Sequence, residues 1–313
     1  MAVKLLQPPV VRRLEYINDY LTGVKQGLDE DELQVQLAET KKRLEREKSL
    51  AVGRGNPYRK GITRTSSLTN YCRRVTESMR LIENDTLTVL GERYLIASEM
   101  ERRQIICKAY SDAYPHFGVL ASTLQRYGTL VLPMRNTPPF RPMAEKYGLD
   151  VHQVTFDTVR DLATDVGLVN WSTVGKATDR RQHVYLVCGL ASSDSQYTVY
   201  HEGRPLHLTP NTVTLDEFRE CLWENYIDLV NGVTGFPVFY SEIRDHVCYE
   251  LKISDPLFNQ YTESLIEDDD KYNVIWSQGI LPRKQDSASM LKSLPPKNID
   301  GNYIIYLKIV RHR

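Results

Sequence analysis

The chain has 313 residues, which is long enough for two or three compact domains. Its composition, 41% hydrophobic and 26% charged, is ordinary for a globular protein and excludes a low-complexity chain. No apolar run approaches the ~20 residues that a membrane-spanning helix needs, and the first residues lack the apolar stretch of a signal peptide. We therefore expect a cytoplasmic protein without a membrane partner.

The formal net charge is zero, but the charges are unevenly distributed. Residues 41–80 hold 12 Lys and Arg against 3 Asp and Glu, a balance of +9. Residues 210–270 hold 3 against 14, a balance of −11, and residues 271–313 hold 8 against 2. Such asymmetry is expected when one face binds nucleic acid and another binds protein, although solvated surface gives the same pattern.

The five cysteines are scattered, and no two have the close spacing of a zinc site. Most lie within apolar patterns, so we expect buried free thiols in a reducing compartment. They are Cys72, Cys107, Cys188, Cys221 and Cys248.

The first 50 residues predict two helices. Leu14, Ile17 and Leu21 repeat at helical spacing, and residues 23–29 predict a break. A second helix is expected over about 31–50, followed by a basic, glycine-bearing loop at 53–61.

The segment after that loop is the most informative part of the first half. Residues 63–67 offer N-cap side chains, and the apolar residues from Leu68 to Ile82 then fall on one stripe of a helix. The opposite face carries polar side chains: Arg64, Ser67, Asn70, Arg73, Arg74 and Glu77. Residues 79–95 (MRLIENDTLTVLGERYL) predict a hydrophobic turn, a short strand and the start of another helix.

This succession resembles the winged-helix pattern, in which a recognition helix ends in a hydrophobic turn before a strand. The resemblance implies DNA binding through the start of the helix at 64–82. Residues 99–132 are expected to be a helical connection, and the prolines between 133 and 142 predict a linker.

Two further units follow. In the second, helices are expected at 143–150 and along the stripe from Phe156 to Val166, with strands at 183–188 and 196–200 and a hairpin turning at 201–205. The third, residues 213–313, reads helix, strand, helix, helix, strand, long polar loop and strand, which is the winged-helix order.

These patterns predict a mainly α protein with small β wings, of the α+β class. We expect tandem winged-helix domains at 51–135, 140–210 and 213–313 after a helical arm at 1–50. Whether that arm belongs to the first winged helix or serves for docking or dimerisation stays open, as does a homodimer.

No catalytic, metal or cofactor motif is found. Residues 174–178 lack the first glycine of a phosphate-binding loop, and the histidines lack ligand spacing. Glu250 and Lys252 form an E-x-K pair of the kind that restriction-type nucleases place on a strand, but here a helix is expected. We therefore predict a protein that is not an enzyme and needs no cofactor or metal.

DNA affinity comes mainly from Lys and Arg at phosphates, and specificity from side chains at base edges. The first unit has both kinds of residue, and we predict that its DNA contacts are Arg59, Lys60, Arg64, Thr65, Ser66, Ser67, Asn70, Arg73 and Arg74. The wing of the third unit adds Arg283, Lys284 and Lys292.

The helices in the corresponding position of the other two units carry carboxylates that would repel phosphates. In the second unit we expect Asp157, Arg160, Asp161 and Asp165 to face solvent. In the third we expect the same of Asp255, Asn259, Gln260, Glu263 and the run 267–270.

The sequence thus favours a DNA-associated protein of prokaryotic type. Its first unit would contact double-stranded DNA and its later units would dock a partner subunit, an ATPase or a nuclease, in a defence or chromosome-maintenance complex. The alternative is an adaptor subunit of such a complex with no DNA contact. A nuclease resting on Glu250 and Lys252 is a third hypothesis.

Overall fold

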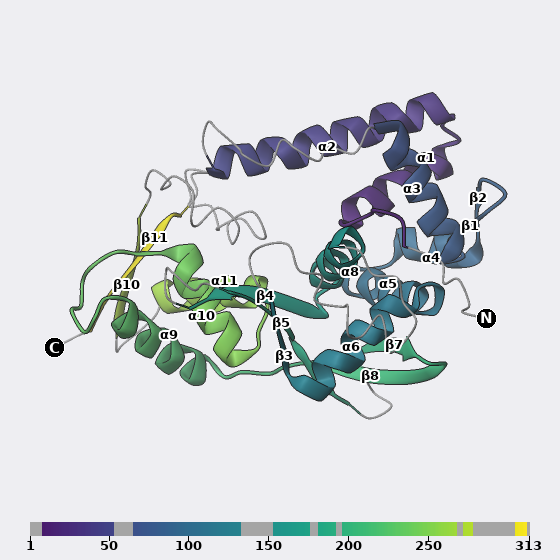
Figure 1. Cartoon of the computed structure of the whole chain (residues 1–313). Coiled ribbons are helices and arrows are strands. Elements are labelled where there is room, and N and C mark those ends of the chain that lie inside the picture. The colour runs from purple at the N-terminus through teal and green to yellow at the C-terminus, as the bar shows by residue number, and fades with distance from the viewer. Residues whose placement is uncertain are drawn as a thin grey trace. The chain divides into compact units, whose positions relative to one another are not determined.

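A computed structural model describes residues 8–52, 65–132, 153–175, 181–191, 196–267, 272–277 and 304–311. It is an α+β structure in which small antiparallel sheets alternate with helices, as the sequence predicts (Figure 1). None of the helices in these ranges is long and apolar enough to cross a membrane. The predicted linker at 133–142, the helix at 143–150 and most of the loop at 277–301 lie outside the described residues.

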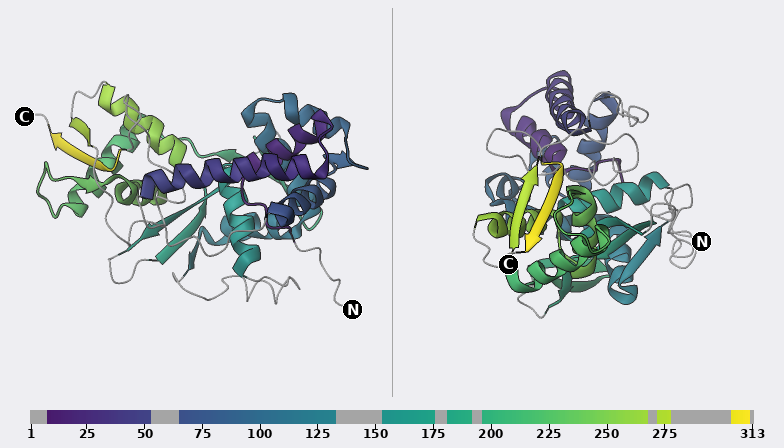
Figure 2. Two further views of the ribbon diagram at one scale, coloured as in Figure 1. Left: turned by 90° about the horizontal axis from the view of Figure 1, so that it is seen from above. Right: turned by 90° about the vertical axis from the view of Figure 1, so that its left-hand side faces the viewer.

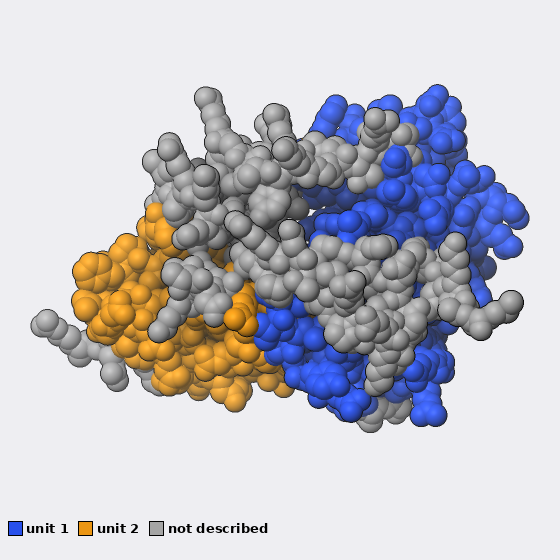
Figure 3. Space-filling view, in the orientation of Figure 1, with its two compact units in different colours: residues 1–44, 60–169, 186–210 blue, residues 45–59, 170–185, 211–313 orange. Residues whose placement is uncertain are grey.

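The chain forms two compact units, each built from separated segments (Figure 3). Unit 1 comprises residues 1–44, 60–169 and 186–210, and unit 2 comprises residues 45–59, 170–185 and 211–313. The domain boundaries expected at 50, 135 and 210 stay predictions.

Unit 1 begins with α1 (Leu14–Gln26) and α2 (Glu30–Val52). The break predicted at 23–29 starts later, because α1 runs through Gly23 and ends at Gly27, whose φ of 74° forms the C-cap. Gly23 is instead a packing residue: a Cβ there would lie 2.5 Å from Leu33 Cδ2 of α2. The absence of a side chain therefore lets the two helices approach closely.

The rest of unit 1 places helices against a three-stranded sheet. Its other elements are α3 (Thr65–Ser78), β1 (Ile82–Glu83), β2 (Thr86–Leu87), α4 (Val89–Ile96), α5 (Glu99–Ala113), α6 (Pro115–Tyr127), β3 (Thr129–Leu132), α8 (Gln153–Asp165), β6 (Cys188–Leu190), β7 (Tyr197–His201) and β8 (Arg204–Pro210). The strands run in the order β6-β8-β7, and α5 and α6 pack against β7. A Cβ at Gly118 of α6 would lie 2.0 Å from the Tyr200 carbonyl oxygen, so only glycine fits there.

Unit 1 differs from the sequence-based prediction at residues 129–132 and agrees with it at residues 196–208. Residues 129–132 form β3 rather than helix, because α6 ends at Gly128 with φ 74°. The hairpin predicted at 196–208 is confirmed: Tyr197 pairs with Leu208 and His201 with Arg204, around a turn at Glu202 and Gly203.

Unit 2 contains the helix and strand order predicted for the C-terminal third. Its elements are β4 (Val169–Val174), β5 (Arg181–Leu186), α9 (Leu215–Leu229), β9 (Val238–Phe239), α10 (Tyr240–Leu251), α11 (Asp255–Glu267), β10 (Tyr272–Ser277) and β11 (Tyr306–Arg311). One sheet has the order β10-β11-β9, with Val274 opposite Ile309 and Leu307 opposite Val238. Phe218, Tyr240 and Phe258 meet edge to face in the core.

Beyond the pair β10–β11, which Figure 2 shows side by side, a buried polar network joins β4 to the helices of unit 2. Asn170 Nδ2 donates to Asp255 Oδ1 at 2.8 Å and to the Ile253 carbonyl at 3.0 Å. Arg244 Nε lies 3.5 Å from Asp255 Oδ2, and the Thr173 amide donates to Asp245 Oδ2 at 2.7 Å. Because all of these side chains are buried, each needs its partners.

Candidate nucleic-acid interface

The helix predicted to contact DNA is α3. Its apolar stripe, Leu68, Cys72 and Val75, is buried, and the helix packs against α1. The Cys72 thiol contacts the Tyr16 carbonyl oxygen of α1. The opposite face exposes Asn70, Arg73, Arg74 and Glu77 at the spacing of one helix stripe, as the sequence predicts.

The two arginines of this face differ in their surroundings. Arg73 Nη1 lies 3.8 Å from Asp85 Oδ1, and Arg73 Nε lies 3.9 Å from Glu77 Oε1. Ion pairs at such distances on half-exposed side chains contribute roughly 0–1 kcal/mol. They therefore orient the Arg73 side chain but are weak enough for a phosphate to replace them. Within the described ranges, no carboxylate forms an ion pair with Arg74.

The hairpin after α3 brings carboxylates to the same side. Asn84 and Asp85 have φ of 51° and 59°, the left-handed pair of a two-residue turn between β1 and β2. Glu83 and Asp85 are exposed there. The exposed charged residues from α3 to the hairpin are Arg73, Arg74 and Arg80 on one side and Glu77, Glu83 and Asp85 on the other, so the described part of this surface is balanced in charge. We call this surface, α3 with the β1–β2 hairpin, the α3 face.

Only some of the remaining predicted DNA contacts lie within the described residues. Thr65 and Ser66 form the first turn of α3, and Ser67 is half-buried. Arg59, Lys60 and Arg64 lie outside the described residues, as do the predicted wing contacts Arg283, Lys284 and Lys292. That these six residues contact DNA stays a prediction.

The carboxylates of α8 do not face solvent as expected, because the segment before α1 covers them. The Leu14 amide donates to Asp165 Oδ2 at 2.6 Å, and Arg12 Nη1 lies 3.4 Å from Asp161 Oδ2. Arg160 is buried and pairs with Asp161 at 2.6 Å and with Asp157 at 3.3 Å. The helix-face pattern alone could not reveal these partners, which come from about 150 residues earlier in the chain.

The expectation for α11 is half correct. Gln260 and Glu263 are exposed, whereas Asp255 is buried in the polar network and Asn259 Oδ1 accepts a hydrogen bond from the Tyr240 hydroxyl at 2.7 Å. The side chains of the acidic run 267–270 lie outside the described residues. The start of α11 therefore serves the core of unit 2 rather than solvent.

The E-x-K pair lies at the end of α10, and its two side chains meet different partners. Glu250 Oε2 accepts a hydrogen bond from Asn225 Nδ2 of α9 at 2.9 Å. Lys252 Nζ lies 3.5 Å from the ring centroid of Tyr249 and 4.9 Å from that of Tyr185. The pair thus sits on a helix, as expected, and not on the strand of a nuclease centre.

Unit 2 presents an acidic stripe on α9. Asp216, Glu220, Glu224 and Asp228 are all exposed and recur every fourth residue, so they lie on one face of the helix. Arg219 pairs with Asp216 at 2.5 Å. Like charges at this spacing destabilise a helix by roughly 0.2–0.5 kcal/mol per pair. We call these four residues the α9 stripe.

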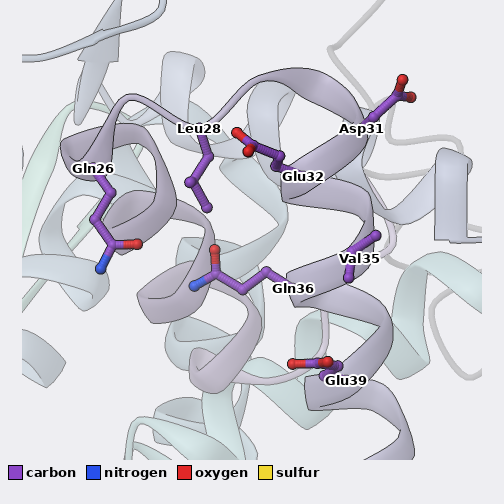
Figure 4. Close-up of a pocket in the computed structure, with 7 residues that line it drawn as sticks. All are labelled: Gln26, Leu28, Asp31, Glu32, Val35, Gln36 and Glu39. Atoms are coloured by element: carbon purple, nitrogen blue, oxygen red, sulfur yellow. The ribbon is translucent and has the colours of Figure 1, made fainter.

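A groove of about 390 Å³ lies where α1 meets α2 (Figure 4). Its lining includes the apolar Leu28 and Val35 and the acidic Asp31, Glu32 and Glu39. Glu32 is already used in capping α2, because its Oε2 accepts from the Asp29 amide at 3.0 Å. The groove is open to solvent, unlike the enclosed clefts in which most small molecules bind.

The five cysteines are buried free thiols, as expected. Burial raises the pKa of four of these thiols, those of Cys72, Cys107, Cys188 and Cys221. A thiol held protonated is a poor nucleophile, so these side chains act as small core residues.

Comparison with known proteins adds nothing to these observations. No protein-family model matches the chain, and no curated protein or solved structure matches it.

Proposed function

We propose that the chain is a non-enzymatic, DNA-associated protein of the winged-helix superfamily, whose α3 face contacts double-stranded DNA. The observation that carries the proposal is the exposed row Asn70, Arg73 and Arg74 on a helix whose other face is buried. Arginine binds phosphates and guanine edges, and asparagine suits adenine. The short hairpin after α3 is in the position of a wing.

The charge balance of the α3 face limits what it can do alone. Three arginines offset by three carboxylates give little net attraction to DNA, so Arg59, Lys60 and Arg64 would have to supply the rest of the positive charge. Binding should therefore be weak, and its affinity should fall as salt rises, since it comes from counterion release at a few phosphates.

The α9 stripe supports the second half of the proposal, a partner subunit docked on unit 2. Arg219 offsets part of the charge of this stripe at Asp216, but its exposed carboxylates still repel one another and would repel phosphates. A basic protein surface would relieve that repulsion and gain complementary charge. An ATPase or nuclease subunit with such a surface is the partner that we propose, in a complex for prokaryotic defence or chromosome maintenance.

An adaptor without DNA contact is the second candidate function. It is favoured by one specific observation, the pairing of Arg73 with both Glu77 and Asp85. In that case the α3 face would be a solvated surface, and only the α9 stripe would act in assembly.

The two functions are separated by measuring binding to a short duplex at two salt concentrations. DNA contact through α3 predicts binding that weakens steeply with salt and is lost in the triple variant Arg64→Ala, Arg73→Ala, Arg74→Ala. Arg126→Ala, which removes an exposed arginine of α6, is the control and should bind like the wild type. A wild-type protein that does not bind at low salt would exclude DNA contact and leave the adaptor.

A further inference from the structure

Helix α4 presents two large apolar side chains to solvent. Val89 is 85% exposed and Ile96 is 79% exposed, more than any other large apolar residue in the described ranges. Both are β-branched, and such residues are poorer helix formers than alanine, leucine or lysine. Neither core packing nor helix propensity therefore explains why these two residues are present.

The two residues lie on one face of the helix, with two opposite charges between them. Glu92 and Arg93 are exposed, and in the described part of the chain neither side chain takes part in an ion pair. The four positions follow at i, i+3, i+4 and i+7, which is the spacing of a single helical face. We call them the α4 stripe: Val89, Glu92, Arg93 and Ile96.

The opposite face of α4 is fixed to the rest of unit 1, so the direction of the stripe is fixed as well. Gly91 and Tyr94 are buried, and a Cβ at Gly91 would overlap the Leu81 carbonyl oxygen. The Tyr94 hydroxyl donates to Asn18 of α1. Arg102 Nε donates to the Tyr94 carbonyl at 3.1 Å, near the end of the helix. A stripe held in this way is ordered before any partner binds, which lowers the entropic cost of association.

The α4 stripe is complementary to itself. Along the helix its side chains are apolar, acidic, basic and apolar. When two copies lie antiparallel across a two-fold axis between residues 92 and 93, Val89 meets Ile96 of the second copy. Glu92 then meets Arg93 of the second copy, and each contact occurs twice because a two-fold interface is isologous. A parallel pair would instead set Glu92 against Glu92, so the charges favour the antiparallel arrangement.

We propose that the chain forms a homodimer through the α4 stripe of unit 1. Pairing removes the apolar side chains of both copies from water and places opposite charges against each other. The dimer does not require DNA contact and does not depend on the α3 face. Because two helices of two turns bury less than the roughly 1,200 Å² of a stable interface, the association should be weak.

Sedimentation of the full chain without DNA is the first test. From about 10 µM to about 1 mM, concentrations that suit the weak affinity of a small interface, the wild type should change from monomer toward dimer. The variant Val89→Ser, Ile96→Ser should stay monomeric over this range, and thermal unfolding should show that it is folded, because both positions are exposed. A wild type that stays monomeric, or a double variant that dimerises like it, would overturn the proposal.

Leu190→Ser is the matched control. It removes a large apolar side chain that is 61% exposed on β6, away from the α4 stripe. It should dimerise like the wild type. Loss of the dimer in this control as well would mean that association does not depend on α4 in particular.

Charge reversals test the antiparallel register. Glu92→Lys sets positive charges against each other in the dimer, and Arg93→Glu sets negative charges against each other. Each variant should dimerise at least about fivefold more weakly, since every change acts twice across the two-fold axis. A mixture of the two variants should recover the wild-type affinity, because opposite charges face each other again in both pairs. Unchanged affinity in the single variants, or a mixture that associates no better than either alone, would contradict the register.

Discussion

Arg73 of α3 and Asp85 of the β1–β2 hairpin face each other, with Nη1 and Oδ1 3.8 Å apart. The pair connects the helix proposed to enter a DNA groove with the hairpin in the position of a wing. It also places a negative charge where a phosphate would approach. Asp85 is therefore the residue whose removal best tests the α3 face.

Asp85→Asn should increase duplex affinity roughly threefold at low salt, because it removes one charge that opposes the phosphates. The turn should survive, since asparagine tolerates the left-handed conformation of residue 85. The measurement is a fluorescence anisotropy titration. Glu224→Gln changes the net charge equally but alters the α9 stripe, and equal gains in both variants would argue for a non-specific charge effect.

Asn170→Ala should destabilise unit 2 by ~2 kcal/mol, because a buried side chain that bridges Asp255 and the Ile253 carbonyl is lost. Urea unfolding followed by tryptophan fluorescence measures the change. Asn225→Ala removes bonds to Cys221 and Glu250 at a partly exposed site and should cost less than about 1 kcal/mol. Equal losses of unfolding free energy in the two variants would show that the buried hydrogen bonds of Asn170 stabilise the fold no more than the partly exposed ones of Asn225.

Gly118→Ala should destabilise unit 1 by roughly 1–3 kcal/mol, since its Cβ would meet the Tyr200 carbonyl oxygen. The clash is with backbone, so the added atom can be accommodated only if α6 moves away from β7. Ser122→Ala, in the same helix, is the control and should stay within about 0.5 kcal/mol of the wild type. Thermal unfolding of both variants decides, and a wild-type Tm for Gly118→Ala would contradict the close packing.

Lys252 predicts a dependence of stability on pH. Its pKa is lowered to about 8, below the ordinary lysine value of 10.5, so between these values the unfolded chain binds more protons than the folded one. Stability contributed by this residue therefore rises with pH over that window. Tyrosines with raised pKa, such as Tyr94, act in the opposite direction at higher pH.

The effect of Lys252 is isolated by comparing wild type with Lys252→Arg in urea at pH 7 and pH 9.5. Arginine stays charged at both values, so the wild type should gain stability relative to the variant at the higher pH. A difference that is the same at both values would mean that the pKa of Lys252 is not lowered.

Much of the fold follows from sequence periodicity. The stripes of α3 and α8, the hairpin β7–β8 and the element order of residues 213–311 are observed where they were predicted, because each has one buried face that repeats at the period of its element. The strand β4 was not predicted. Its residues Val169–Thr173 are all buried, and the polar Asn170 and Ser172 among them bind side chains elsewhere in the chain, which the local pattern does not reveal.

Sequence periodicity predicted less of the candidate site than of the fold. The pattern around α3 identified Asn70, Arg73 and Arg74 as exposed. It could not show that the β1–β2 turn would place Asp85 within 3.8 Å of Arg73. The expectation for α8 was wrong because its covering segment precedes α1, and the buried role of Asp255 depends on Asn170. Pairings across such sequence distances leave no periodic signal along the chain.

The discontinuity of unit 2 limits how this chain can be divided. Asn170 and Thr173 hydrogen-bond to residues that lie 72 to 85 positions later. A fragment starting near residue 213 would keep every helix of the C-terminal third but leave Asp245 and Asp255 without these partners. Residues 213–313 are thus not expected to fold as an independent domain. Recombination that transfers this unit between related proteins is expected to include the chain from residue 170 onward, and not to begin at the apparent boundary at 213.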